Sequence, residues 1–148
     1  MSKKILIVHT SWYEQYISEM LNISKEILKD FDCTLAKAPG ALELAPLASY
    51  KVRPEEYTNL LGANIRDEAI YSGILFLGVV IRGETSHYDL VTKETFKAIN
   101  SLAMEYARLS FINNVICVEN KEQLEARLIK TTTNNAKALI QLMNEKSS

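Results

Sequence analysis

The sequence predicts an α/β protein built around a four-stranded parallel sheet with helices on both faces. Four short apolar runs, each of strand length, alternate with segments whose apolar residues recur at the helical period. The first run is continuously apolar, which is typical of a strand buried on both faces. The four runs are residues 5–8, 33–36, 74–81 and 114–118.

Helices are expected between and after these strands. The apolar periodicity predicts them at residues 16–28, 41–50 and 88–107, followed by two closing helices at 122–129 and 135–143. Ser86 and Asp89 have the spacing of a capping-box variant before the third helix. Residues 51–68 include Pro54 and Gly62 and mix charges of both signs, so we expect a surface excursion there, with a helical turn near residues 56–61.

The composition of the 148 residues is that of a single soluble globular domain, with 47% hydrophobic and 24% charged residues. A formal net charge of −1 provides no basic field for nucleic acid. The first apolar run is too short for a signal sequence or a membrane span, so a cytoplasmic protein is expected. Cys33 and Cys117 have no close partner and are expected to be buried reduced thiols, not ligands of a metal site.

Chemically informative residues follow three successive strands, and the carboxyl ends of parallel strands share one edge of a sheet. Trp12 and Tyr13 follow the first strand, either as an aromatic helix entrance or as a stacking platform for a planar ring. Residues 39–43 follow the second strand, and two interpretations are open for them. They are either a plain turn that leads into a helix, with Glu43 in its first turn, or a segment whose exposed amides and carboxylate form hydrogen bonds with the edge of a uracil-like ring. Their common edge favours one ligand site.

The turn after the third strand, residues 82–87, combines anion-binding and proton-transfer groups. Gly83 permits close backbone approach, and the amides of the next helix, with the Thr85 hydroxyl, attract an anion. The Glu84 carboxylate would repel a phosphate unless it turns outward or pairs with Arg82. His87 is either structural or, at the start of a helix in a polar turn, a proton carrier.

Arg127 lies in a late helix, and two interpretations remain open for it. It is either a solvated helix charge or a guanidinium fork for phosphate.

Three ordered motifs resemble the 6,7-dimethyl-8-ribityllumazine synthase family. They are Pro-Gly-Ala-Leu-Glu at 39–43, Gly-Val-Val-Ile-Arg-Gly-Glu-Thr-Ser-His-Tyr-Asp at 78–89, and Glu-Asn-Lys-Glu-Gln-Leu-Glu-Ala-Arg at 119–127. The resemblance implies one flavodoxin-like domain, a three-layer α/β/α sandwich. It implies a transferase that joins 5-amino-6-(D-ribitylamino)uracil to 3,4-dihydroxy-2-butanone 4-phosphate without a cofactor or metal. It further implies homopentamers with active sites between subunits, sometimes assembled into a 60-subunit shell.

The same resemblance implies a role for each matching residue. His87 would be the catalytic proton donor. The uracil and its ribityl chain would contact Trp12 or Tyr13, Ala41, Leu42, Glu43, Val79, Val80, Ile81 and Asn113. The phosphate would be bound by Gly83, Glu84, Thr85 and, from the neighbouring subunit, Arg127.

The chain also departs from the family pattern. Residues 51–68 include an insertion relative to the family. Asn135 stands where a lysine is common in the family. Either Lys130 or Lys137 supplies that positive charge instead, or the affinity for phosphate is weaker. The chain starts directly at the first strand, which favours a pentamer over a shell.

Three other kinds of protein are alternatives to the synthase. One is a non-catalytic flavin- or lumazine-binding relative, and another is an archaeal-type riboflavin synthase. A flavodoxin-like electron carrier is disfavoured because no Ser/Thr-Gly-rich loop follows the first strand.

Overall fold

The computed structural model describes residues 3–53 and 70–148. Its elements follow one another in strand–helix alternation. They are β1 (Lys4–Thr10), α1 (Glu14–Ile27), β2 (Asp32–Ala38), the short 3₁₀ helix η1 (Ala41–Glu43), α2 (Leu44–Val52), β3 (Gly73–Ile81), α4 (His87–Glu105), β4 (Ser110–Val118) and α5 (Lys121–Ser147).

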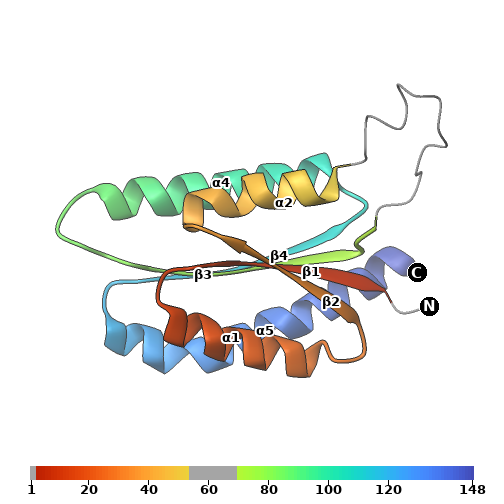
Figure 1. Cartoon of the computed structure of the whole chain (residues 1–148), viewed down its shortest axis with the longest axis horizontal. Coiled ribbons are helices and arrows are strands. Elements are labelled where there is room, and N and C mark those ends of the chain that lie inside the picture. The colour runs from red at the N-terminus through yellow and green to blue at the C-terminus, as the bar shows by residue number, and fades with distance from the viewer. Residues whose placement is uncertain (1–2, 54–69) are drawn as a thin grey trace.

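The predicted α/β fold is confirmed: the four strands form one parallel sheet in the order β2-β1-β3-β4. α2 and α4 cover one face of the sheet, and α1 and α5 cover the other, so the molecule has three layers (Figure 1). The strand order reverses direction at β1, which pairs with β2 on one side and β3 on the other. In an open parallel sheet, the carboxyl ends of strands at such a reversal are where ligands bind.

Side chains of the central strands alternate between two hydrophobic cores, one on each face of the sheet. Ile5 and Ile7 are fully buried in the cluster that includes residues of α1 and α5. Leu6 and Val8 are fully buried in the cluster that includes residues of α2 and α4. Because helices cover both faces, a central strand has no polar side, which explains its continuous apolar run.

The C-terminal region forms one helix, α5, so the expectation of two closing helices was wrong. The stretch Thr131–Asn135 favoured a break because threonine and asparagine are weak helix formers. The structure uses two of these side chains in contacts with β4. Asn114 donates from Nδ2 to Thr132 Oγ1 at 3.0 Å, and Asn135 donates from Nδ2 to Asn114 Oδ1 at 2.7 Å. These tertiary hydrogen bonds outweigh the low local propensity.

The segment after β2 also differs in detail from the prediction. The expected helix at 41–50 begins instead with the 3₁₀ turn η1, and α2 then continues to Val52. Residues 51 and 52 are therefore helical and not part of a surface excursion. The rest of that predicted excursion, with its helical turn at 56–61, falls almost entirely on residues 54–69, outside the described residues.

The predicted capping box at the start of α4 is also wrong. The Ser86 side chain makes no capping hydrogen bond. The backbone N–H of His87 donates instead to Thr85 Oγ1 at 3.2 Å. The Asp89 carboxylate is engaged with Arg82, so it cannot serve as the reciprocal cap.

Candidate functional site

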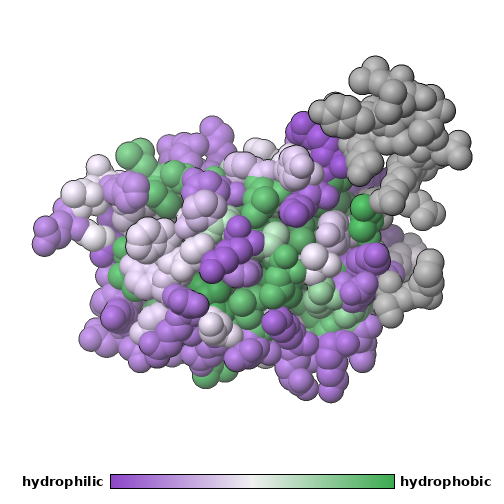
Figure 2. Space-filling model, in the orientation of Figure 1, coloured by the Kyte–Doolittle hydropathy of each residue, from purple (hydrophilic) through white to green (hydrophobic). Residues whose placement is uncertain are grey.

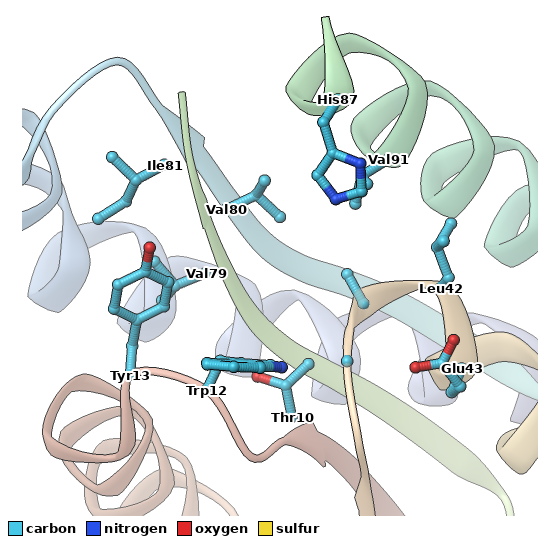
Figure 3. A pocket seen from close by; sticks show the side chains of 12 residues that line it. Thr10, Trp12, Tyr13, Leu42, Glu43, Val79, Val80, Ile81, His87 and Val91 are labelled. Atoms are coloured by element: carbon cyan, nitrogen blue, oxygen red, sulfur yellow. The ribbon is translucent and has the colours of Figure 1, made fainter. Parts of the chain in front are cut away.

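An open pocket of about 310 Å³ lies at the carboxyl ends of β1, β2 and β3 (Figure 3). It therefore occupies the edge of the sheet at which the sequence placed a ligand site. Its lining residues are Thr10, Trp12, Tyr13, Gly40, Ala41, Leu42, Glu43, Val79, Val80, Ile81, His87 and Val91. Every candidate uracil-contacting residue except Asn113 is among them, together with His87.

The loop after β1 brings two consecutive aromatic side chains to this pocket. Tyr13 has φ 57° and ψ 50°, in the left-handed region that non-glycine residues seldom adopt. This backbone turn lets both rings reach the pocket. Trp12 is 69% exposed and Tyr13 40% exposed, so neither ring is a buried core aromatic at the helix entrance. The arrangement is that of a surface for a planar ligand.

Gly40 allows the second wall of the pocket to lie close to the first. A Cβ atom at this position would lie 3.2 Å from Glu43 Oε1 and 3.8 Å from Trp12 Nε1. The first distance is shorter than an ordinary carbon–oxygen contact, so glycine lets the carboxylate fold back over the turn. The Glu43 carboxylate and the Trp12 indole thus both lie within 4 Å of where a Cβ at Gly40 would be.

His87 begins α4 and supplies the titratable side chain on the opposite side of the pocket. Figure 3 shows its imidazole projecting from the end of α4 toward the pocket, near Val91 and across from Trp12. The side chain is exposed, so protons can exchange with solvent. An imidazole in this position can serve as a proton donor or acceptor toward a molecule bound in the pocket.

The predicted phosphate turn lies beside His87 but does not line the pocket. Gly83, Glu84 and Thr85 are all exposed. A Cβ at Gly83 would meet no atom within 4 Å, so packing within the chain does not require glycine there. Glu84 is not the observed partner of Arg82, because Arg82 binds two other carboxylates. The sequence led us to expect that the Glu84 carboxylate either turns outward or pairs with Arg82. The expected pairing with Arg82 is therefore wrong.

Those two carboxylates belong to Asp89 and Glu119. Arg82 donates from Nη1 and Nη2 to the two oxygens of Asp89 at 3.3 and 3.1 Å, and from Nε to Glu119. Its guanidinium carbon also lies 4.3 Å from the centre of the Tyr88 ring. The hydrogen bonds that Arg82 donates to Asp89, and next the one that it donates to Glu119, raise the pKa of Arg82 above its ordinary value. Sequence reasoning assigned Arg82 no such role, although the residues involved all lie in the family motifs.

Asn113 and Arg127 lie away from the pocket in this chain. Asn113 is on β4, where it lines a second groove of about 470 Å³ with residues of α4 that include Phe96 and Asn100. Its Oδ1 accepts a hydrogen bond from the backbone N–H of Val115 at 2.8 Å, which satisfies a donor on the sheet edge. Arg127 is exposed on α5. One chain thus brings together most of the candidate site, but not these two residues.

The two cysteines are unpaired thiols, as expected, but both are half-buried, so the expectation of full burial was wrong. Desolvation raises the pKa of the Cys117 thiol to about 11. Among residues 3–53 and 70–148, no group of three or more His, Cys, Asp or Glu side chains could hold a metal ion. Within the same ranges, no helix is both long enough and apolar enough to cross a membrane.

The fold and the pocket together define a class: a flavodoxin-like α/β protein with an open pocket at the switch point of its sheet. Comparison with known proteins gives the family. The model of the 6,7-dimethyl-8-ribityllumazine synthase family matches residues 2–147. The chain belongs to this family, whose members are transferases of riboflavin biosynthesis.

Individual relatives agree with this assignment. The chain is 35% identical over 129 residues to 6,7-dimethyl-8-ribityllumazine synthase 1 of Rhizobium meliloti (strain 1021), a match covering 86% of this chain and 78% of the relative. It is 34% identical over 126 residues to the 6,7-dimethyl-8-ribityllumazine synthase of Agrobacterium fabrum, covering 84% and 78%. It is 29% identical over 146 residues to that of Neisseria meningitidis serogroup C (strain ATCC 700532), covering 95% and 83%.

Proposed function

We propose that this protein condenses 5-amino-6-(D-ribitylamino)uracil with 3,4-dihydroxy-2-butanone 4-phosphate to give 6,7-dimethyl-8-ribityllumazine, phosphate and water. The observation that carries the proposal is the meeting of Trp12, Glu43 and His87 in one pocket. These residues come from three separate segments and supply a planar surface, an acceptor and a proton carrier. All three can assist a condensation between an aromatic amine and a ketone.

The uracil ring is proposed to stack on Trp12. The exposed indole offers a flat face at the floor of the pocket, and aromatic stacking contributes about 0.5–1.5 kcal/mol beyond burial. Glu43 then accepts hydrogen bonds from the polar groups of the ligand, and the apolar side chains of Val79, Val80 and Ile81 line the adjacent wall. Tyr13 extends the aromatic surface beside them.

His87 is proposed to move the protons of the reaction. The amine attacks the ketone and water leaves to form an imine. Phosphate is then eliminated, and the ribityl-bearing nitrogen attacks the remaining carbonyl and closes the second ring with loss of a second water. Every step transfers a proton. A positioned acid or base contributes about 10²–10⁴-fold to such a reaction. Holding the two substrates together contributes at least as much, because it replaces a bimolecular encounter.

The phosphate is proposed to bind at the start of α4. The amides of a helix N-terminus attract an anion, and Thr85 adds a hydroxyl. Since Thr85 Oγ1 accepts the His87 N–H, its own hydrogen remains available to donate to a phosphate oxygen. Gly83 and Glu84 would then contact the phosphate through their backbone.

Asn113 and Arg127 are proposed to act in the pocket of a neighbouring subunit. Both lie outside the pocket of their own chain, and the surface carries large exposed apolar side chains suited to an interface. Leu90, Phe96 and Met104 of α4 are 62%, 44% and 75% exposed. Figure 2 shows further hydrophobic residues at the surface between the helix layers, where β2 leaves Leu35 40% exposed. A closed ring of five subunits is the proposed assembly.

A direct assay tests the proposed function. The purified protein is mixed with both substrates while lumazine absorbance and inorganic phosphate are followed together. We expect one phosphate per lumazine, at a rate well above the uncatalysed condensation. A folded protein that gives only the background rate, but binds lumazine or flavin, would instead be a non-catalytic relative.

A further inference from the structure

Arg82 connects three elements at the edge of the sheet that carries the pocket. Its backbone N–H donates to the carbonyl of Val118 at 2.9 Å, which continues the pairing of β3 with β4. Its side chain binds Asp89 in the first turn of α4 and Glu119 before α5, and it covers the ring of Tyr88. Each nitrogen of the guanidinium therefore donates a hydrogen bond, and one of its faces lies against an aromatic ring.

The Glu119 end of this cluster is anchored to α5. The backbone N–H of Glu119 donates to Gln123 Oε1 at 2.8 Å, and the Gln123 N–H donates to the capping side chain of Asn120 at 2.9 Å. The start of α5 is thus held by two reciprocal hydrogen bonds. Arg82 follows β3 and binds Glu119 at the start of α5, and its contacts with Asp89 connect both to the first turn of α4.

The turn that Arg82 spans has little other support. Residues 83–86 are exposed, and Gly83 has open space around it. His87 follows this turn and directly precedes Tyr88 and Asp89, the two residues of α4 that the guanidinium contacts. The direction in which α4 presents the imidazole therefore depends on the Arg82 contacts.

We propose that Arg82 is a positioning residue that fixes the first turn of α4, and with it the His87 imidazole, over the pocket. The kinetic part of this inference rests on the proposed function. Arg82 is not itself a phosphate ligand in this account, since the two carboxylates that it binds leave the cluster with a net negative charge. It acts on the reaction through His87.

The conservative substitution Arg82→Lys tests the kinetic part, because lysine keeps the charge but lacks the planar fork. We expect kcat to fall about 10- to 100-fold, since small displacements of a catalytic group cost this much. The KM for the butanone phosphate should stay within about twofold, because losing an interaction made only in the transition state lowers kcat and leaves KM unchanged. In a His87→Ala background, Arg82→Lys should lower kcat no further. A large rise in that KM with unchanged kcat, or an equal fall in both backgrounds, would overturn the proposal.

Hydrogen exchange followed by mass spectrometry tests the structural part without any reaction. In Arg82→Lys, and in Asp89→Asn as a second variant, amides of residues 87–90 should exchange about tenfold faster, as expected for a locally released helix end. Glu119→Gln should have a similar effect, whereas the matched control Glu122→Gln in the first turn of α5 should have none. Unchanged exchange in a folded Arg82→Lys protein would overturn the proposal. Faster exchange in a protein that makes no lumazine would support the positioning role and contradict the proposed function.

Discussion

The Asn135 side chain on α5 donates from Nδ2 to Oδ1 of Asn114 on β4 at 2.7 Å. This contact keeps a buried amide satisfied within the layer between the sheet and the helix. Removing Asn135 should leave the buried Oδ1 of Asn114 without this donor, so Asn135→Ala should lower the free energy of unfolding by about 1–3 kcal/mol.

Urea denaturation checks this prediction, and the neighbouring Asn134→Ala provides the control. Asn134 is exposed, so its removal should change the free energy of unfolding by less than about 0.5 kcal/mol. Equal effects of the two variants would show that the Asn114–Asn135 contact does not stabilise the fold.

His87→Ala should reduce kcat yet leave measurable lumazine formation. The expected loss is about 10²–10⁴-fold, the usual contribution of a positioned acid or base, while substrate positioning persists. Steady-state kinetics with both substrates measures the effect. An unchanged kcat would remove His87 from the mechanism.

Arg127→Ala should raise the KM for the butanone phosphate far more than the KM for the uracil. Loss of a charge-assisted hydrogen bond of about 1.5–3 kcal/mol corresponds to roughly a 10- to 150-fold weaker interaction. Lys121, exposed at the start of the same helix, offers a control through Lys121→Ala. Equal effects of Arg127→Ala on both substrates would count against a phosphate role.

Gly40→Ala should weaken binding of the uracil substrate without unfolding the protein. The added methyl group would meet Glu43 Oε1 at 3.2 Å and push the carboxylate away from Trp12. The backbone of Gly40 is extended, a conformation that alanine adopts without strain. We expect a higher KM for the uracil, an unchanged KM for the butanone phosphate and a melting temperature close to that of the original protein. A rise in both KM values would mean that the turn has collapsed more widely.

Cys117 should react slowly with thiol reagents in the folded protein. With a pKa of about 11, only about one thiol in a thousand is ionised at pH 8, and the thiolate is the reactive form. Labelling of a Cys33→Ala variant with iodoacetamide should therefore speed up sharply on unfolding. Because burial in the folded protein raises this pKa above the ordinary thiol value of 9.0, the contribution of the neutral thiol to stability is complete below pH 9 and is lost as the pH rises through about 11. Equal labelling rates in the folded and unfolded states would contradict this.

Much of the fold could be predicted because the buried central strands must be apolar on both faces. The single helix α5 could not, since its threonines and asparagines are stabilised by contacts with Asn114 that no local pattern reveals. The contacts of Arg82 could not be predicted either, because its partners lie on α4 and between β4 and α5. By contrast, Trp12, Glu43 and His87 were predicted to share a site, because parallel strands end at a common edge.

A hybrid oligomer of His87→Ala and Arg127→Ala subunits provides the most direct test of the central claim, a two-substrate pocket served by two chains. In an equal random mixture, about a quarter of the pockets of a head-to-tail ring combine an intact His87 with an intact neighbouring Arg127. Activity at limiting butanone phosphate should therefore recover to about a quarter of the original value. If both residues served the pocket of their own chain, no intact pocket would form. Activity equal to the mean of the two variants would then contradict the account.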